Sequence, residues 1–299
     1  MPDSSCRISM FSRRSRDVSP QEVRKLLLEP GTTHLGTNGQ HNSTQTTASR
    51  VNGWVAHDNG YEKTCKALAR PGWYGVVKRS VDIVVAALLV VPALPIIFLA
   101  ALVIKISSRG PAFYSQVRLG RHGRPFKIYK IRTMSHECEM LSGPRWSTPG
   151  DPRITRIGAI LRRRHVDELP QLLNVLCGQM SLIGPRPERP EFLPLLEQAL
   201  PTYRHRLLVR PGVTGLAQVQ LPADTDLVSV RRKLVYDLYY IRQLGPWLDL
   251  QILLCTILYA AAVPFRWSRK LFHVPSGEAV ERVVAVPLVP EALALISVS

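Results

Sequence analysis

One apolar run constrains this chain of 299 residues more than any other feature. From Ile83 to Ile104 the sequence reads IVVAALLVVPALPIIFLAALVI, which contains no charged residue. At about 1.5 Å per residue, a straight helix of this length would be about 33 Å long, which matches the hydrocarbon core of a bilayer. A buried helix of a soluble domain is the alternative, but such helices seldom remain apolar for so long. We therefore predict a membrane-embedded helix within residues 76–109.

Two prolines inside this run, Pro92 and Pro95, predict a kink, because each removes a backbone donor and clashes with the preceding turn. A kinked helix could cross the membrane, or it could turn back toward the side from which it entered. The residues that flank the two ends are basic: Lys78, Arg79, Lys105 and Arg109. Since positive flanks favour the cytoplasmic side, we favour a re-entrant helix with both ends in the cytoplasm.

The charge of the chain narrows its choice of partners. There are 39 Lys and Arg residues against 22 Asp and Glu residues, a formal net charge of +17 at pH 7. Such an excess indicates an anionic partner, which could be nucleic acid, anionic lipid or a phosphorylated substrate. The five cysteines are far apart and form no C-x-x-C pair, so the sequence suggests neither a zinc site nor a disulfide framework. A reduced, cytoplasm-facing location is the simpler interpretation.

The remaining sequence divides into three parts. Residues 1–70 include a long stretch of Gly, Ser, Thr, Asn and Gln, which buries too little apolar surface to offset its chain entropy. We predict a disordered polar extension there. Residues 110–265 combine strand and helix patterns and form the expected catalytic domain. Residues 266–299 form a tail in which we find no motif.

Within residues 110–265, aromatic and β-branched residues at 112–118 and 126–132 predict a β-hairpin. A 3.6-residue apolar period predicts amphipathic helices at 192–203 and 227–241. Residues 247–263 are apolar but too short for a span, and they suit an interfacial helix or a core helix equally well. The expected fold class is α+β: a monotopic membrane protein with a kinked re-entrant helix, interfacial amphipathic helices and a small cytosolic catalytic domain.

Two adjacent carboxylates, Asp167 and Glu168, lie in the segment HVDELPQLLNVL. Proline is tolerated only in the first turn of a helix, so Pro170 predicts that a helix begins near Asp167. The structural interpretation is that Asp167 caps this helix and Glu168 complements its dipole. Taken alone, this interpretation is the stronger one.

The surroundings of the pair favour a catalytic interpretation. Three arginines stand directly upstream, and the segment GPRP follows at residues 184–187. Arginine binds phosphate oxygens bidentately, and helix N-termini attract phosphates. An exposed, ionised aspartate can attack phosphorus and form an acyl phosphate. An adjacent glutamate can hold Mg²⁺ while substrate phosphates complete its coordination. The pattern therefore predicts phosphoryl transfer.

Four blocks of the sequence resemble the signature blocks of bacterial sugar transferases, the monotopic polyprenyl-phosphate phosphoglycosyl transferases. The blocks are VVKRSVDIVV, GPAFYSQVRLGRHGRPFKIYKIRTM, DPRITRIGAILRRRHVDELPQLLNVLCGQMSLIGPRPERPEF and RPGVTGLAQV. The resemblance covers roughly residues 76–262 in the family's order and spacing. It implies transfer of a sugar-1-phosphate from a UDP-sugar to undecaprenyl phosphate with release of UMP, at the cytoplasmic face of a bacterial inner membrane. Such a reaction starts exopolysaccharide or related glycan synthesis.

The resemblance also assigns roles to individual residues. Asp167 would be the nucleophile that forms an aspartyl-phosphosugar intermediate, and Glu168 would bind Mg²⁺, the expected cofactor. The remaining positions would bind substrate phosphates: Lys130, Arg132, Arg162, Arg186 and Asp237. The expected partners are the UDP-sugar, the polyprenyl phosphate, membrane lipid, downstream glycosyltransferases and, in a homodimer, a second copy of the chain. No nucleic acid is expected.

Two departures from the family pattern stand out. Members break the re-entrant helix with a Ser-Pro pair, whereas this chain has Leu94-Pro95. Members commonly read G-W-A-Q-V-N-G where this chain has Leu216 for the tryptophan and Gln220-Leu221 for Asn-Gly. We interpret the segment around these residues, 210–219, as a glycine-punctuated loop.

Three other functions compete with this interpretation. A hydrolytic relative would resolve the same aspartyl phosphate with water. An inactive relative would keep the fold without the reaction, as the altered loop allows. A membrane-tethered nucleic-acid-binding protein would also be basic, but no recognition motif or stacking platform is visible in the sequence.

Overall fold

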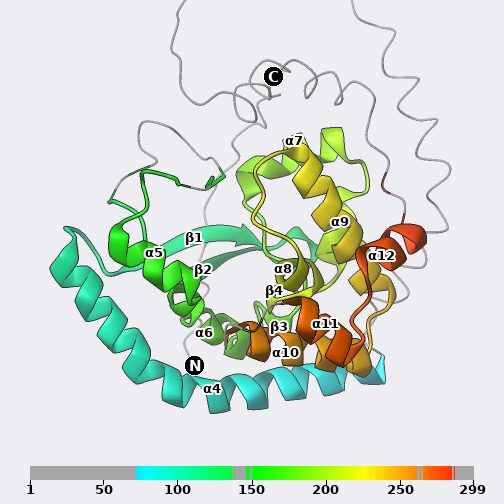
Figure 1. Cartoon of the computed structure of the whole chain (residues 1–299), viewed down its shortest axis with the longest axis horizontal. Coiled ribbons are helices and arrows are strands. Elements are labelled where there is room, and N and C mark those ends of the chain that lie inside the picture. The colour runs from blue at the N-terminus through cyan, green and yellow to red at the C-terminus, as the bar shows by residue number, and fades with distance from the viewer. Residues whose placement is uncertain are drawn as a thin grey trace, which may run out of the picture.

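The computed structural model describes residues 72–136, 138, 146–148, 150–260, 263, 265–284 and 286. The polar extension predicted at residues 1–70 lies outside these ranges. The described part mixes helices with two small sheets, which confirms the expected α+β class. Figure 1 shows one long helix, α4, lying along an edge of the molecule, with the remaining elements gathered on one side of it.

Helix α4 (Trp73–Ser107) is continuous over 35 residues and contains both prolines. It bows along its length in Figure 1. Much of its apolar surface is uncovered, and Leu88, Phe98 and Ile106 are about 70% exposed or more. Within the described residues it is the one helix long and apolar enough to cross a membrane. These features suit a helix embedded in lipid, while its re-entrant topology stays a prediction.

The first turns of α4 are anchored to the rest of the fold by polar contacts. Asp82 is buried and accepts a hydrogen bond of 3.0 Å from the amide of Leu182 in β3 (Ser181–Ile183). The Arg79 guanidinium donates to the last two carbonyls of α6 (Gln171–Leu176), at 2.7 and 3.0 Å. Lys78 pairs with Asp249 of α10 (Pro246–Ala260) at 2.6 Å. Residues 78–82 therefore belong to the globular fold.

Two sheets organise the body of the protein. The predicted hairpin is confirmed as β1 (Phe113–Leu119) and β2 (Pro125–Ile131), which pair antiparallel across the short helix η1 (Arg121–Gly123). A second sheet pairs β3 in parallel with β4 (Gly212–Thr214). The prediction of a loop at 210–219 is therefore wrong in part, since β4 and the start of α8 (Leu216–Gln220) form there.

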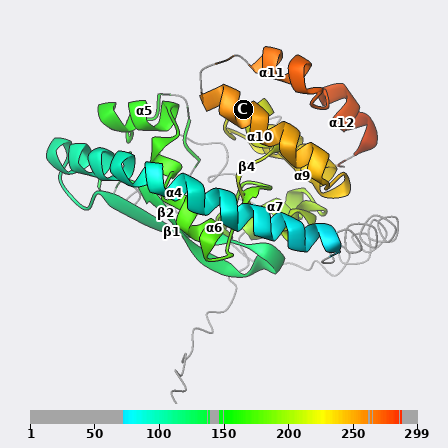
Figure 2. The same ribbon diagram turned by 90° about the horizontal axis from the view of Figure 1, so that it is seen from below.

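Helices cover both sheets. Before β3, the chain forms α5 (Arg156–Arg163), the 3-10 turn η2 (Val166–Glu168) and α6. After β3 it forms η3 (Pro190–Phe192), α7 (Leu193–Ala199) and η4 (Tyr203–Leu208), so the helix predicted at 192–203 ends before Pro201 as proline requires. Seen from below (Figure 2), α4 crosses the molecule with the hairpin on one side and helices α9 to α12 on the other.

The amphipathic helix predicted at 227–241 is confirmed as α9 (Leu227–Arg242), whose apolar face lies in the core. In α10, Leu248, Ile252 and Cys255 are buried, whereas Trp247 is 68% exposed. The helix is therefore a core helix on one face and leaves a large aromatic side chain uncovered at its start. The core interpretation of residues 247–263 is therefore confirmed for one face of α10, while the interfacial interpretation stays a prediction.

The segment expected to be a tail without features continues the fold. It contains α11 (Phe265–Phe272) and α12 (Gly277–Val283). Four of its valines are buried in the main core: Val274, Val280, Val284 and Val286. Burial of an aliphatic side chain contributes about 1.5 to 3 kcal/mol, so these residues stabilise the domain.

Candidate active site

The carboxylate pair lies in a tight turn just before α6. His165 adopts a left-handed conformation with φ of 54°, and the 3-10 turn η2 that follows carries Asp167 and Glu168. The N-cap of α6 is Pro170, and no described side chain caps it by a hydrogen bond. The capping role predicted for Asp167 is therefore wrong. The chain folds into a 3-10 turn before the proline instead of extending the helix back to the aspartate.

Both carboxylates are buried rather than exposed. Asp167 is 6% exposed and Glu168 is 9% exposed, because η2 packs against β2 and α5. The expectation that Asp167 is exposed is therefore wrong, although its side chain does lie among cations. A buried carboxylate is stable as an anion only when charged or hydrogen-bonding partners surround it.

Glu168 receives two such partners from separate elements. The Nζ of Lys130, on β2, lies 2.6 Å from its Oε1, and a guanidinium nitrogen of Arg186 lies 2.7 Å from the same oxygen. Burial alone would raise the pKa of Glu168, but the charges of Arg186 and Lys130 hold it well below its ordinary value. Glu168 is therefore an anion at neutral pH.

Asp167 has a different electrostatic environment. Burial and the negative charge of Glu168 raise its pKa, while Lys130, Arg162 and Arg186 act in the opposite direction. Arg162 reaches the site from α5 and donates from Nε to Thr133 Oγ1 at 2.7 Å. No described side chain is paired with Asp167 by a hydrogen bond or ion pair, which leaves its oxygens available as nucleophiles.

Three predicted cations and two predicted carboxylates are thus brought together. They are Lys130, Arg162, Arg186, Asp167 and Glu168. Their formal charges sum to +1, so the cluster attracts an anion and can neutralise a phosphate. A phosphate that meets an unpaired carboxylate among cations is the arrangement that nucleophilic attack on phosphorus requires.

Arg132 and Asp237 lie elsewhere. Arg132 is buried at the C-terminal end of α4, where its guanidinium donates to the carbonyls of Arg109 and Ser108 and, at 2.8 Å, to the Ser108 hydroxyl. Asp237, on α9, forms an ion pair of 2.7 Å with Arg206. Neither residue forms a hydrogen bond or ion pair with the carboxylate pair, since Arg132 is engaged by the residues that follow α4 and Asp237 by Arg206.

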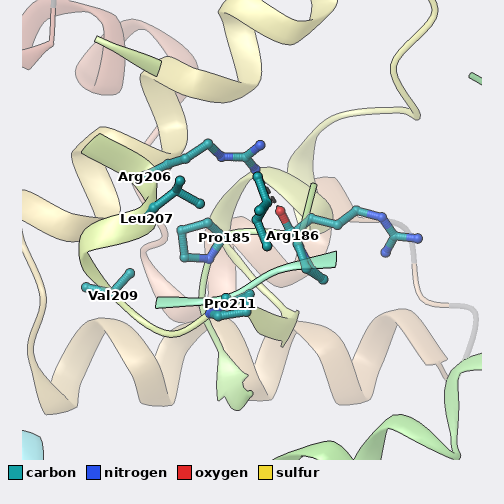
Figure 3. Close-up of a pocket in the computed structure, with 9 residues that line it drawn as sticks. Pro185, Arg186, Arg206, Leu207, Val209 and Pro211 are labelled. Atoms are coloured by element: carbon teal, nitrogen blue, oxygen red, sulfur yellow. Dashed lines mark hydrogen bonds between the residues drawn. The ribbon is translucent and has the colours of Figure 1, made fainter. Parts of the chain in front are cut away.

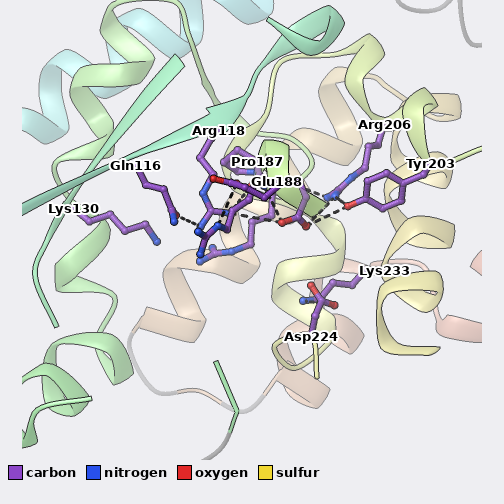
Figure 4. Close-up of polar contacts among 12 residues, drawn as sticks. Gln116, Arg118, Lys130, Pro187, Glu188, Tyr203, Arg206, Asp224 and Lys233 are labelled. Atoms are coloured by element: carbon purple, nitrogen blue, oxygen red, sulfur yellow. Dashed lines mark hydrogen bonds and ion pairs between the residues drawn. The ribbon is translucent and has the colours of Figure 1, made fainter. Parts of the chain in front are cut away.

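A buried polar network lies beside the site and was not predicted (Figure 4). Glu188 stands between Arg118 and Arg206, at 3.8 and 3.7 Å, and accepts a hydrogen bond of 3.2 Å from the Tyr203 hydroxyl. Next to it, Lys233 pairs with Asp224 at 3.0 Å. The sequence signal was weak, because these residues are far apart in the chain and share no motif. Among these residues, only Glu188 adjoins a motif that the sequence had singled out, since it directly follows the GPRP segment.

The network also borders a small pocket (Figure 3). Its lining includes Pro185, Arg186 and Arg206. The figure shows the Arg206 guanidinium directed at the backbone of Arg186, whose own side chain extends the opposite way. The Arg206 nitrogen lies 2.9 Å from the Arg186 carbonyl oxygen.

The residues of the site are compatible with an Mg²⁺ ion that a protein carboxylate and the substrate phosphates would bind together. Among the described residues there is no group of three or more His, Cys, Asp or Glu side chains that could hold a metal unaided. Mg²⁺ usually takes only one or two protein carboxylates and completes its coordination with substrate phosphates and water. Oε2 of Glu168 makes a single long contact, 3.4 Å from Arg186, and retains the capacity to bind a cation.

Comparison with known proteins identifies the family and several relatives of this chain. The family model described as Bacterial sugar transferase matches residues 73–262. A UDP-N-acetylgalactosamine-undecaprenyl-phosphate N-acetylgalactosaminephosphotransferase of Aeromonas hydrophila is 39% identical over 207 residues, which is 69% of this chain and 49% of the relative. The chain therefore spans about half the length of that relative.

Two further relatives are covered more fully. A UDP-glucose:undecaprenyl-phosphate glucose-1-phosphate transferase of Caulobacter vibrioides is 46% identical over 182 residues, 60% of this chain and 68% of the relative. The exopolysaccharide production protein PSS of Rhizobium leguminosarum bv. phaseoli is 43% identical over 190 residues, 61% of this chain and 94% of the relative. The matched region contains α4, both sheets and every residue of the carboxylate cluster. The chain belongs to the bacterial sugar transferase family.

Proposed function

We propose that this protein transfers a sugar-1-phosphate from a UDP-sugar to undecaprenyl phosphate and releases UMP. The observation that carries the proposal is the buried, unpaired Asp167 carboxylate beside Glu168, under the influence of three cations. The names of the relatives support the choice of donor and acceptor, since they describe UDP-sugars and undecaprenyl phosphate.

In the first half-reaction, an Asp167 oxygen attacks the phosphorus that bears the sugar. An oxygen–phosphorus bond forms to the aspartate while the bond to the UMP oxygen breaks, and UMP leaves with that electron pair. Lys130, Arg162 and Arg186 stabilise the charge that develops on the phosphate oxygens. Burial removes competing water from the aspartate, which strengthens each of these interactions.

In the second half-reaction, a phosphate oxygen of undecaprenyl phosphate attacks the same phosphorus and the Asp167 carboxylate is released. The acceptor is a lipid, and the exposed apolar surface of α4 supports its delivery from a membrane. We place the protein at the cytoplasmic face of a bacterial inner membrane. The lipid-linked product would be the substrate of downstream glycosyltransferases in exopolysaccharide or related glycan synthesis.

Glu168 is the residue that would hold Mg²⁺. When bound, this ion supplies additional positive charge for the diphosphate of the donor. Glu168 also keeps Lys130 and Arg186 in place, so its contribution does not depend on the metal alone.

The experiment is UMP release by membranes that carry the protein, supplied with Mg²⁺, undecaprenyl phosphate and a panel of UDP-hexoses. We expect Asp167→Asn to lower the rate by about 10³-fold or more, because the amide cannot form the acyl phosphate. The matched control is Asp226→Asn, the same chemical change at the exposed N-cap of α9, where asparagine caps about as well as aspartate.

Mass spectrometry of wild-type protein quenched during turnover should find a sugar phosphate on the peptide that contains Asp167. UMP release by Asp167→Asn at the wild-type rate would remove this residue as the nucleophile. Free sugar phosphate formed equally well without any lipid acceptor would identify a hydrolase instead. Absence of release with every donor in the panel would favour an inactive relative.

A further inference from the structure

The segment Pro185–Glu188, which carries Arg186, is held by an unusual set of hydrogen bonds. All four of its consecutive backbone carbonyls accept a bond from a donor outside the segment. In order, the donors are the amide of Gly212, the guanidinium of Arg206, the guanidinium of Arg118 and the amide of Leu119, at 2.9, 2.9, 3.0 and 2.9 Å.

Two of these donors are side chains for a physical reason. Pro185 and Pro187 have no N–H group, so the segment cannot pair with a neighbouring strand in a regular ladder. Its carbonyls still need partners, because a buried carbonyl without one costs about 1 to 3 kcal/mol. The outer two carbonyls meet backbone amides, and the inner two meet Arg206 and Arg118.

Each of the two arginines is itself held in place. Arg206 pairs with Asp237 at 2.7 Å and with Glu188 at 3.7 Å. Arg118 donates to Gln116 at 2.6 Å and lies 3.8 Å from the other oxygen of Glu188. Figure 4 shows Glu188 between them. These partners fix each guanidinium relative to the backbone it supports.

The Arg186 side chain leaves this fixed backbone toward the carboxylate pair and reaches Glu168 at 2.7 Å. We propose that Arg206 and Arg118 are positioning residues for the transfer reaction, which act by fixing the backbone from which Arg186 reaches Glu168 and the substrate phosphate. Asp237 acts through Arg206 in the same way. This inference rests on the proposed function, since it names residues that serve its active site.

A double-mutant cycle tests the proposal by UMP release. Arg206→Gln should lower kcat/KM by about 10- to 100-fold, because a displacement of about 1 Å at a positioning group can cost that much. If Arg206 acts through Arg186, the loss should vanish when Arg186 is absent. The double variant Arg206→Gln/Arg186→Ala should therefore fall within about twofold of Arg186→Ala alone. A merely structural role would lower both backgrounds by the same factor.

The matched control is Arg231→Gln, because Arg231 also donates from its guanidinium to a backbone carbonyl, that of Val286, at 2.8 Å. We expect its kcat/KM to remain within about twofold of wild type. Wild-type activity of a folded Arg206→Gln would overturn the proposal, as would an equal loss in both backgrounds. If Arg206→Gln fails to fold, Arg118→Gln is carried through the same cycle, with the same outcomes.

A second readout separates this inference from the proposed function. Hydrogen–deuterium exchange at the amides of Gly212 and Leu119, which donate to the segment, should accelerate by about tenfold or more in Arg206→Gln and stay unchanged in Arg231→Gln. This result does not require turnover. A wild-type protein that releases no UMP would contradict the proposed function, whereas unchanged exchange in Arg206→Gln would contradict the positioning role.

Discussion

At the scale of single residues, Glu168 shows how one buried carboxylate can join two distant parts of the chain. Its Oε1 accepts from Lys130 of the hairpin and from Arg186 of the segment after β3. A buried anion between two cations is stable only while all three charges are present, because removal of one leaves an uncompensated charge. The same set lowers the pKa of Glu168 and shapes the environment of Asp167.

This dependence predicts the stability of variants at the site. Lys130→Met should destabilise the fold by about 2 kcal/mol, because Glu168 loses a buried partner. The double variant Lys130→Met/Glu168→Gln should recover at least half of that loss, since the charge that needed the lysine is also gone. Denaturation in detergent measures both. Equal destabilisation of the single and double variants would contradict the coupling.

A part of the site could be predicted from residue patterns and a part could not. The cluster of Lys130, Arg162 and Arg186 around the carboxylate pair followed from the resemblance to the family, and the structure brings these residues together. The burial of Asp167 could not be predicted, because it depends on how η2 packs against β2. The supporting arginines escaped notice because their partners are carbonyls, which leave no mark in a sequence pattern.

At the scale of elements, α4 combines two kinds of surface. Its first turns carry Arg79 and the buried Asp82, which bind α6 and β3, while its later turns expose apolar side chains. The apolar run predicted the helix, but the anchoring residues lay just outside that run and looked like ordinary flanking charges. Asp82 near its start and the carbonyl of Ser108 at its end both bond to the folded domain, which fixes the direction of the helix relative to that domain.

The re-entrant topology can be tested with single cysteines at the ends of α4. In a chain whose native cysteines are replaced, Ser80→Cys and Ser107→Cys are conservative changes at exposed positions. We expect a membrane-impermeant thiol reagent to label both from the cytoplasmic side of inverted vesicles, and neither from the periplasmic side of spheroplasts. Labelling of the two positions from opposite sides would show that α4 spans the membrane.

The two departures from the family pattern after β4, at Leu216 and Gln220, lie in α8. Leu216, where family members commonly carry tryptophan, is 1% exposed and fills the core. Gln220, which replaces asparagine, donates to the carbonyl of Pro275 at 3.3 Å. Pro275 lies beyond the region that the family model matches. The departure from the family pattern therefore coincides with contacts to the additional C-terminal helices, a link that sequence alone could not reveal.

At the scale of the whole molecule, buried charge makes the stability of the fold depend on pH. Burial raises the pKa of Asp237 from its ordinary value of 3.8 to about 6, although Arg206 and Lys233 act in the opposite direction. Between these values the unfolded chain has released the proton that the folded protein still holds. The free energy of unfolding therefore falls as the pH rises through this window, by about 3 kcal/mol in total.

Replacing the carboxyl group of Asp237 should make the free energy of unfolding depend less on pH. We expect the free energy of unfolding of Asp237→Asn to fall less than that of wild type between pH 4 and pH 6, because asparagine carries no proton that titrates in this window. Chemical denaturation across this range provides the comparison. Parallel profiles for the two proteins would show that another group carries the pH dependence.

The positions of the four donors that hold Pro185–Glu188 determine when this segment can acquire its partners during synthesis of the chain. Two of them, on Arg118 and Leu119, precede the segment in the chain, and two, on Arg206 and Gly212, follow it. A nascent chain that has just emerged through residue 188 holds only half of the required donors. The candidate site can therefore be completed only after residue 212 has been synthesised, long after the residues of α4.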